Sequence, residues 1–251
     1  MKQGLTTPAH GSALLSVQGL NAWYGAAHIL FGLDLEVHRG EVVALMGRNG
    51  AGKSTTLKSI MGLLRRYRGS ISFMGARIDG ARPYRIARRG LGYVPEERRI
   101  FTDLTVRENL EVGRQQARRW PGGEEARNWT PAHLYELFPN LAAMRERRGG
   151  QMSGGEQQML TIARTLMGNP YMILLDEPSE GVAPVIVEQI AHMILELKQR
   201  GVSILLSEQN LPFARLVSDR VYVLEQGEIR YAGAMQALVN DAAARRAYLE
   251  V

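Results

Sequence analysis

A glycine-rich segment, GRNGAGKST at residues 47–55, restricts the possible folds of this chain more than any other feature. It follows an apolar run at residues 42–46 and precedes a stretch with helical spacing, so we expect a buried strand, a loop and a helix in that order. Gly47, four further residues and then Gly52-Lys53-Ser54 fit the P-loop pattern, in which backbone N–H groups and a helix N-terminus surround phosphate oxygens. A glycine-rich turn that only caps a helix is the alternative.

The residues of this segment have separate expected roles. Gly50 and Gly52 allow positive φ and a close approach of the backbone to a ligand, which a Cβ would hinder. Lys53 would reach the β- and γ-phosphates of a nucleotide, and the Ser54 hydroxyl would be a ligand of Mg²⁺. We expect nucleotide contacts from the whole segment, namely Gly47, Arg48, Asn49, Gly50, Ala51, Gly52, Lys53, Ser54 and Thr55.

Composition narrows the class of protein. A chain of 251 residues that is 45% hydrophobic can form one large domain, or one domain with an inserted lobe. We expect it to be soluble and cytoplasmic, because no apolar run reaches the roughly 18 residues that span a bilayer. The absence of cysteine excludes disulfides and thiolate sites, so a metal would need oxygen ligands. The net charge of +6 permits anionic partners, although a solvated basic face explains it as well.

The first part of the chain suggests short strands. Residues 1–12 are polar and aperiodic, and we expect a disordered leader. Strands are expected at residues 14–20 and 33–37, with Tyr24 in a loop between them, and a turn at residues 65–69. The Tyr24 ring could stack on a purine, or it could simply pack against a sheet edge.

A change of character marks the middle of the chain. Residues 96–160 are charged and rich in helical spacing, and Thr105 with Glu108 forms a capping box at the start of one helix. We therefore expect an α-helical lobe inserted into an α/β core. The basic cluster at residues 85–89 has no interleaved aromatic residues, which favours a helix surface over a nucleic-acid patch.

A serine and two glycines, Ser153-Gly154-Gly155, precede the next helical segment. Ser153 and Glu156 form a capping box, which is one sufficient explanation of this pattern. Free N–H groups and a hydroxyl at a helix N-terminus can also bind an anion, so both interpretations stay open.

Polar residues follow two apolar runs later in the chain. The apolar run at residues 171–175 is followed by Asp176 and Glu177. Asp176 can hold Mg²⁺, and Glu177 can orient and deprotonate water. The run at residues 202–206 ends in Ser207-Glu208-Gln209-Asn210. Ligands of parallel α/β sheets bind beyond the carboxyl ends of the strands, so both polar sets should face the nucleotide.

Taken together, these segments resemble the ATP-binding subunit of ABC transporters from about residue 14 onward. The resemblance rests on Tyr24, GRNGAGKST, GYVPE, MSGGEQQ, LLDEPSEG and LLSEQN, which occur in the order and spacing of that family. It implies an α/β P-loop NTPase fold of the ABC ATPase type, with an antiparallel β subdomain and an α-helical lobe at about residues 96–160. This domain would span residues 13–251, and its cofactors would be ATP and Mg²⁺.

This resemblance implies roles for particular residues. Tyr24 would stack on adenine, while Ser153, Gly154 and Gly155 would meet the γ-phosphate of ATP bound by another protomer. Asp176 would hold Mg²⁺, and Glu177 would be the catalytic base.

Three positions depart from the family pattern, and one of them is Val182, which stands at the position of the D-loop aspartate. Glu96 replaces the usual glutamine and could still be a ligand of Mg²⁺. Gln209 replaces the usual histidine and could donate an amide hydrogen bond to the γ-phosphate, although it cannot carry a proton.

A narrower resemblance concerns the transported solute. The segments VPEERRIF, DEPSEGVAP and SEQN look like the second ATPase subunit of branched-chain amino-acid importers, of which close relatives serve urea and amides. This implies integral-membrane permease subunits, a second ABC ATPase subunit in a homo- or heterodimer, and indirectly a periplasmic or extracellular solute-binding protein. The chain would lie on the cytoplasmic face of the membrane, and no nucleic-acid partner is expected.

Two other functions are alternatives. A soluble ABC ATPase that acts on nucleic acid or ribosomes usually has a second ATPase domain or a coiled-coil insertion, for which 251 residues leave no room. A non-hydrolytic regulatory subunit would agree with Glu96 and Gln209, but the presence of Glu177 opposes it.

Overall fold

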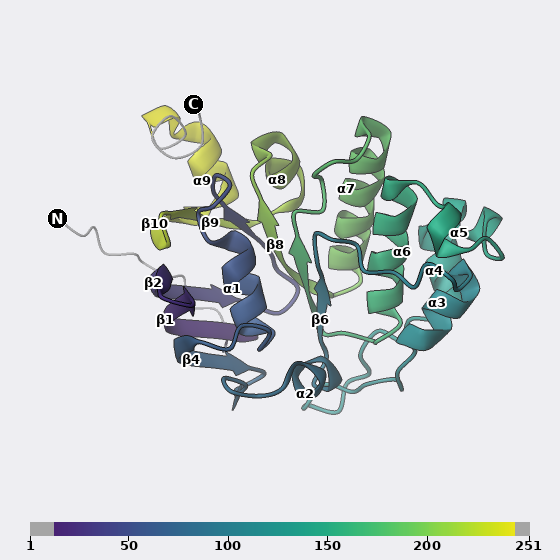
Figure 1. Ribbon diagram of the computed structural model, residues 1–251, viewed down its shortest axis with the longest axis horizontal. Helices are drawn as coiled ribbons and strands as arrows, with labels where there is room; N and C mark the ends of the chain where they lie inside the picture. The colour runs from purple at the N-terminus through teal and green to yellow at the C-terminus, as the bar shows by residue number, and fades with distance from the viewer. Residues whose placement is uncertain (1–12, 244–251) are drawn as a thin grey trace.

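Two β-sheets and the helices around them make up residues 13–243, the part of the chain that this computed structural model describes (Figure 1). The leader expected at residues 1–12 lies outside the described residues. The strands are β1 (Leu15–Tyr24), β2 (Ala27–Val37), β3 (Val42–Met46), β4 (Tyr67–Phe73), β5 (Ala76–Arg77), β6 (Leu91–Val94), β7 (Met172–Asp176), β8 (Ser203–Glu208), β9 (Arg220–Glu225) and β10 (Glu228–Ala234). The helices are α1 (Lys53–Ile60), α2 (Pro83–Arg88), α3 (Val106–Gly113), α4 (Pro131–Leu137), α5 (Pro139–Ala143), η1 (Gly149–Gln151), α6 (Gly154–Leu166), α7 (Pro184–Gln199), α8 (Leu211–Val217) and α9 (Met235–Asn240).

The larger sheet has the strand order β10-β9-β3-β8-β7-β6 within the described residues. Strands β6, β7, β8, β3 and β9 are parallel, and β10 returns antiparallel to β9. Every residue of β3, β7 and β8 is buried, as expected for central strands of a parallel sheet that is covered on both faces. Asp176 pairs with Ser207, and Met46 pairs with Glu208, so these three strands end at the same level.

The smaller sheet is antiparallel, with the order β2-β1-β4-β5. Here two sequence predictions are wrong. Tyr24 ends β1 instead of lying in a loop, because Tyr24 pairs with Ala27 and the hairpin continues almost to its tip. Tyr67 belongs to β4 rather than to a turn, because it pairs with Ala22 of β1. Register shifts in both strand pairs interrupt the apolar alternation on which the sequence prediction depended.

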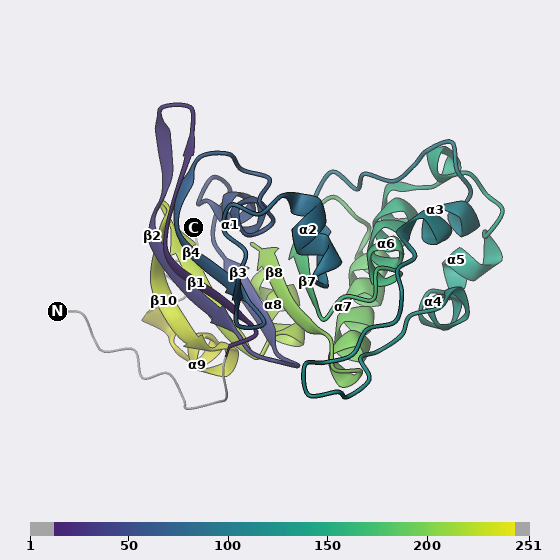
Figure 2. The ribbon, with the colours of Figure 1, turned by 90° about the horizontal axis from the view of Figure 1, so that it is seen from below.

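Two hydrophobic cores lie on opposite faces of the larger sheet. Helix α1 packs between the sheets, with contacts to β1, β2, β7 and β8, and buries Leu57 and Ile60 there (Figure 2). The opposite face is covered by α6, α7 and α8, whose buried side chains include Leu160, Ile194 and Phe213. The loop after β3 therefore emerges between the sheets, at the carboxyl end of the parallel strands.

Helices α3 to α6 form the end of the molecule farthest from the antiparallel sheet (Figures 1 and 2). Helix α3 packs on α6, and its capping box at Thr105 and Glu108 is present as predicted. Asn109, fully buried, donates to the carbonyls of Phe101, Leu104 and Thr105 and accepts from the Phe101 N–H. This one side chain holds the loop before α3 against the helix.

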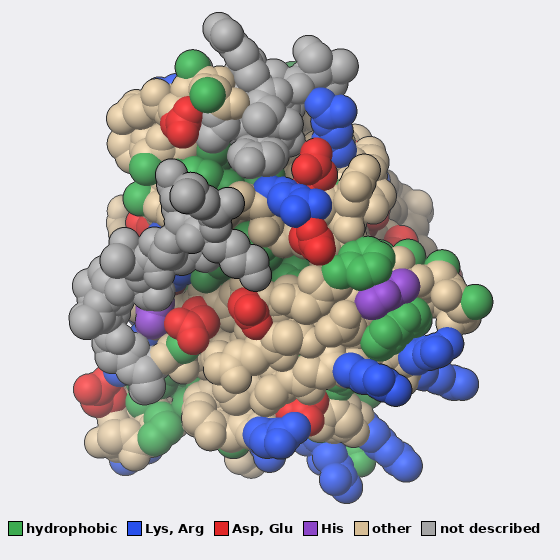
Figure 3. Space-filling view, turned by 90° about the vertical axis from the view of Figure 1, so that its left-hand side faces the viewer, with side chains coloured by type: hydrophobic (Ala, Val, Ile, Leu, Met, Phe, Trp, Pro, Cys, Tyr) green, Lys and Arg blue, Asp and Glu red, His purple; other side chains and the backbone are tan. Residues whose placement is uncertain are grey.

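The surface of the antiparallel sheet forms the opposite end of the molecule. Figure 3 views this face, where most of the visible Lys and Arg side chains lie toward the lower edge. Among residues 13–243, no helix is long and apolar enough to cross a membrane.

Candidate functional site

The loop between β3 and α1 requires glycine at particular places. Gly52 has φ 110°, and a Cβ there would lie 2.6 Å from Cδ2 of Leu30. A Cβ at Gly47 would lie 2.3 Å from the carbonyl oxygen of Leu224. Gly50, at φ 81°, has open space around it, so only its backbone conformation favours glycine. The backbone of this loop is thus shaped as a P-loop pattern demands, with neighbouring strands packed closely behind it.

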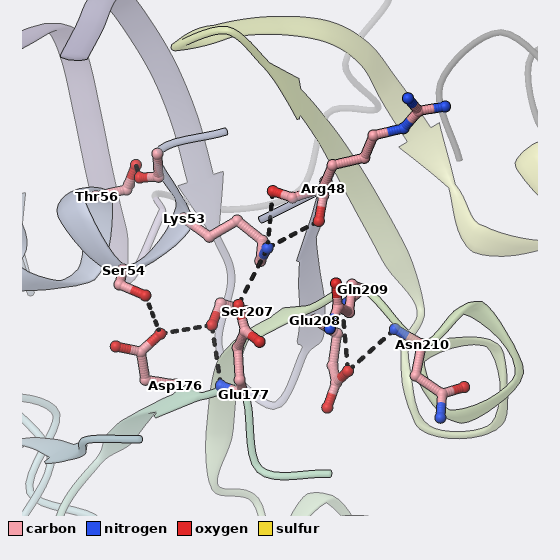
Figure 4. Close-up of polar contacts among 12 residues, drawn as sticks. Arg48, Lys53, Ser54, Thr56, Asp176, Glu177, Ser207, Glu208, Gln209 and Asn210 are labelled. Atoms are coloured by element: carbon pink, nitrogen blue, oxygen red, sulfur yellow. Dashed lines mark hydrogen bonds and ion pairs between the residues drawn. The ribbon is translucent and has the colours of Figure 1, made fainter. Parts of the chain in front are cut away.

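Lys53, the first residue of α1, folds back over this loop. Its side chain is 3% exposed, and its ammonium donates to the carbonyls of Gly47 (2.8 Å) and Arg48 (3.2 Å). The third partner is Oε1 of Glu177 at 3.1 Å, in an ion pair whose carboxylate is 7% exposed (Figure 4). Lys53 therefore already has a full set of partners, and a phosphate would have to replace one of them.

Asp176, at the end of β7, is 1% exposed and is surrounded by hydroxyl groups. Ser54 donates to its Oδ1 at 2.9 Å, and Ser207 donates to the same oxygen at 2.7 Å (Figure 4). Tyr93 donates to Oδ2 at 3.0 Å. Burial raises the pKa of Tyr93, and the charge of Asp176 and the hydrogen bond to it raise this pKa further. The phenol therefore stays protonated and remains a donor. These hydrogen bonds compensate the burial of the carboxylate.

Ser207 also connects Asp176 to the next residue. While its hydroxyl donates to Asp176, the same oxygen accepts from the Glu177 N–H at 3.0 Å. Sequence analysis placed Ser207 near the nucleotide but gave no role to it or to Tyr93. The signal that could have found them is strand register, because β6, β7 and β8 are neighbours in the sheet.

Glu177 has an unusual backbone and a buried carboxylate. Its φ is 47°, a left-handed conformation that costs a non-glycine residue about 1–3 kcal/mol and is found mainly at functional sites. Burial raises its pKa, but hydrogen bonds with Glu180 and Lys53 outweigh burial, so the pKa is lowered overall. Glu177 is therefore ionised at neutral pH and able to accept a proton from water.

Glu180 is an acidic neighbour that the sequence analysis missed. Its N–H donates to the Glu177 carbonyl at 3.1 Å, and the two side chains are hydrogen bonded as well. That hydrogen bond, burial and the nearby charges of Glu177 and Glu96 raise the pKa of Glu180 to about 7. Two acids three residues apart around a turn were the available sequence signal.

Buried Glu208 holds the loop that carries Gln209. Its carboxylate accepts from the backbone N–H groups of Ser179, Gln209 and Asn210 at 3.1 to 3.2 Å (Figure 4). Burial raises the pKa of Glu208. Gln209 itself is exposed, so its amide is accessible beside the site.

Two predicted site residues lie at the periphery. Tyr24 is 48% exposed at the end of β1, where its ring is available for stacking. Glu96 is exposed two residues after β6, and within residues 13–243 no hydrogen bond or ion pair joins it to Ser54 or Asp176. The structure therefore does not bring Glu96 into contact with the other predicted metal ligands.

Ser153, Gly154 and Gly155 lie at the start of α6, away from α1 (Figures 1 and 2). The capping box is formed, since Ser153 N donates to Glu156 at 2.7 Å and Ser153 Oγ accepts from the Glu156 N–H at 3.4 Å. A Cβ at Gly155 would lie 2.7 Å from Ile186, so close packing requires glycine there. Exposed Ser153 has no described contact with the P-loop of its own chain.

The donor set near α1 suits a divalent cation bound together with phosphates. No group of three or more His, Asp or Glu side chains in the described part of the chain could hold a metal alone. Ser54 Oγ and an Asp176 oxygen, 2.9 Å apart, are hard oxygen donors. Mg²⁺ commonly binds through one or two carboxylates plus substrate phosphates, and the site fits that pattern.

Comparison with known proteins agrees with this geometry. A sequence model of the family described as ABC transporter matches residues 30–180. The chain belongs to the ABC transporter family. This ABC protein binds and hydrolyses ATP, and the predicted family, fold class and ATPase activity are confirmed.

Individual relatives extend over almost the whole chain. The high-affinity branched-chain amino acid transport ATP-binding protein BraG of Pseudomonas aeruginosa is 42% identical over 236 residues, which cover 94% of this chain and 99% of BraG. The lipopolysaccharide export system ATP-binding protein LptB of Haemophilus influenzae is 36% identical, covering 94% and 97%. A crystal structure of a nucleotide-free ATP-binding cassette from an ABC transporter has a TM-score of 0.77 and 28% identity, covering 93% and 97%.

Proposed function

We propose that this ABC ATPase powers the import of branched-chain or other hydrophobic amino acids through a partner permease. The observation that carries the choice of solute is the 42% identity with BraG, against 36% for LptB at similar coverage. Urea or a related amide is the alternative solute, because the segments around Glu96 and Glu180 resemble a group of importer subunits of which some relatives serve urea and amides.

The chemistry follows from the residues at the ends of β3, β7 and β8. ATP would place its phosphates on residues 47–55 and its adenine on Tyr24. Lys53 would exchange Glu177 for phosphate oxygens, and this exchange would release the carboxylate toward water. Glu177 would then accept the proton of the attacking water, and Gln209 would donate an amide hydrogen bond to the γ-phosphate.

The proposed role of magnesium is limited to neutralising the charge of the ATP phosphates. When bound with ATP, Mg²⁺ would offset the negative charge of the phosphates. Ser54 and Asp176 would hold it, since their oxygens are 2.9 Å apart in a partly buried position. Glu96 could join them only if the exposed loop after β6 moved.

Assembly would complete the site from outside the chain. Ser153, Gly154 and Gly155 would bind the γ-phosphate held by a second ABC ATPase subunit, because their exposed helix start is remote from the P-loop of the same chain. The permease subunits would anchor this pair on the cytoplasmic face of the membrane. A periplasmic or extracellular solute-binding protein would deliver the amino acid, and no nucleic acid is involved.

Reconstitution with the permease that copurifies from native membranes tests this proposal. Phosphate release in proteoliposomes should rise when leucine and the binding protein are added, and Lys53→Ala should abolish the rise by removing phosphate binding. Stimulation by urea alone would select the amide importer. Stimulation by lipopolysaccharide but not by leucine or urea would contradict import and favour an export function like that named for LptB.

A further inference from the structure

Tyr93 reaches Asp176, the proposed metal ligand, from β6, and no other residue of that strand is among the site residues described above. It lies in β6, and its hydroxyl donates to Oδ2 of Asp176, 83 residues away in sequence, at 3.0 Å. The other carboxylate oxygen, Oδ1, accepts from Ser54 and Ser207. Tyr93 thus donates a hydrogen bond to the carboxylate oxygen that neither of those serine hydroxyls contacts.

Strand register explains how this contact arises. Tyr93 pairs with Leu174 of the parallel strand β7, so the long side chain spans two further residues to reach Asp176. The ring of Tyr93 packs against the hydrophobic core beside α1, and its hydroxyl donates the hydrogen bond to the Asp176 carboxylate. A phenylalanine at this position would keep the packing and lose the single hydrogen bond.

Hydrogen bonds on both oxygens fix the rotation of a carboxylate. With Tyr93 on Oδ2, the plane of the Asp176 carboxylate is held so that Oδ1 faces Ser54. Without it, the carboxylate could rotate about its terminal bond, whose torsional preference is broad. The oxygens of Ser54 and Asp176 would then spend less time in the arrangement that a metal ion requires.

We propose that Tyr93 is a positioning residue that orients Asp176 for magnesium and connects it to the loop bearing Glu96. Glu96 follows Tyr93 by three residues, so a shift of that loop would move the Tyr93 hydroxyl and, through its hydrogen bond, the Asp176 carboxylate. The inference rests on the proposed role of Asp176 and Ser54 as metal ligands. Tyr93 itself would act through Asp176 and would bind neither metal nor nucleotide.

The test uses Tyr93→Phe in a Glu177→Gln background, which prevents turnover. Binding of a fluorescent ATP analogue is followed by anisotropy while Mg²⁺ is titrated, and again in EDTA. Loss of one hydrogen bond to a charged group should raise the Mg²⁺ concentration for half-saturation by about five- to tenfold, because Ser54 and Ser207 still hold Asp176. Affinity in EDTA should not change.

A matched control removes another tyrosine hydroxyl. Tyr67, in β4, accepts from the Gly80 N–H at 2.6 Å and lies in the antiparallel sheet. Tyr67→Phe should leave the Mg²⁺ requirement unchanged. Hydrogen–deuterium exchange adds a readout independent of affinity: Mg–ATP should slow exchange at residues 95–100 in the parent and in Tyr67→Phe, but not in Tyr93→Phe.

Several outcomes would overturn the proposal. An unchanged Mg²⁺ requirement in Tyr93→Phe would remove the positioning role, and an equal loss of affinity in EDTA would show a general structural defect instead. Retained slowing at residues 95–100 would remove the connection to the Glu96 loop. If the parent itself bound the nucleotide equally well with and without Mg²⁺, while Asp176→Asn had no effect, the proposed metal site would fail, whatever Tyr93 does.

Discussion

Replacement of Glu177 by glutamine should strengthen ATP binding while it stops hydrolysis. Glu177 would compete with an incoming phosphate for Lys53, because its Oε1 lies 3.1 Å from the Lys53 ammonium. The ion pair stabilises only the state without nucleotide. Its removal therefore destabilises that state relative to the ATP complex, and it also removes a negative charge close to the phosphates.

The magnitude follows from the burial of this pair. A hydrogen bond to a charged group is worth about 1.5–3 kcal/mol, and both side chains here are almost fully buried. Glutamine keeps an oxygen that can accept from Lys53 without the charge, so we take about half of this value as lost. The dissociation constant of ATP should then fall by about three- to tenfold. Hydrolysis should fall by at least about 100-fold, because a general base is removed.

Isothermal titration calorimetry and phosphate release measure the two effects separately. Glu97→Gln is a suitable control, since Glu97 lies 3.9 Å from Lys58 and the Glu97 side chain is 50% exposed, in contrast to buried Glu177. Such a surface pair contributes about 0–1 kcal/mol, and this variant should bind and hydrolyse ATP normally. Equal or weaker ATP binding by Glu177→Gln would refute the competition argument, and unaltered turnover would remove Glu177 from catalysis.

Further outcomes follow from other residues. Gly52→Ala should cost about 2 kcal/mol in a denaturant titration and abolish ATP binding, because φ 110° and the contact with Leu30 exclude a Cβ. Hydrolysis should rise between pH 6 and 8, because Glu180 then loses its proton, stops donating to Glu177 and leaves Glu177 a stronger base. Glu180→Gln, a donor at every pH, should flatten this pH–rate profile. Asn109→Ala should lower the free energy of unfolding by about 2–3 kcal/mol in the same titration, since buried carbonyls and an N–H lose their partner.

Local patterns predicted the parts of the site that are contiguous in sequence. The glycines of residues 47–55 and the carboxylates after residue 175 are recognisable because each set is presented by one strand end. Helix starts were equally accessible, since the capping boxes at Thr105 and Ser153 involve residues only three positions apart. The interactions that stabilise these features are short-range, and a sequence pattern therefore contains them.

Contacts between strands could not be predicted in this way. Tyr93 and Ser207 meet at Asp176 because β6 and β8 flank β7, and that order depends on the packing of the whole sheet. The prediction of a loop at Tyr24 was wrong for a related reason, since register shifts between β1 and β2 disguise the alternation of apolar residues. Composition and spacing alone are insufficient to predict a contact that depends on the packing of several segments far apart in sequence.

The level ends of β3, β7 and β8 have a consequence for heat inactivation. These strands are buried on both faces, so they belong to the region that should open last, whereas the exposed helix start at Ser153 and the loop after β6 should open earlier. Under the proposed function, warming should therefore disable contact with neighbouring subunits before it disables nucleotide binding. A partly heated sample would still retain ATP on a column after its ability to respond to a transported solute had been lost.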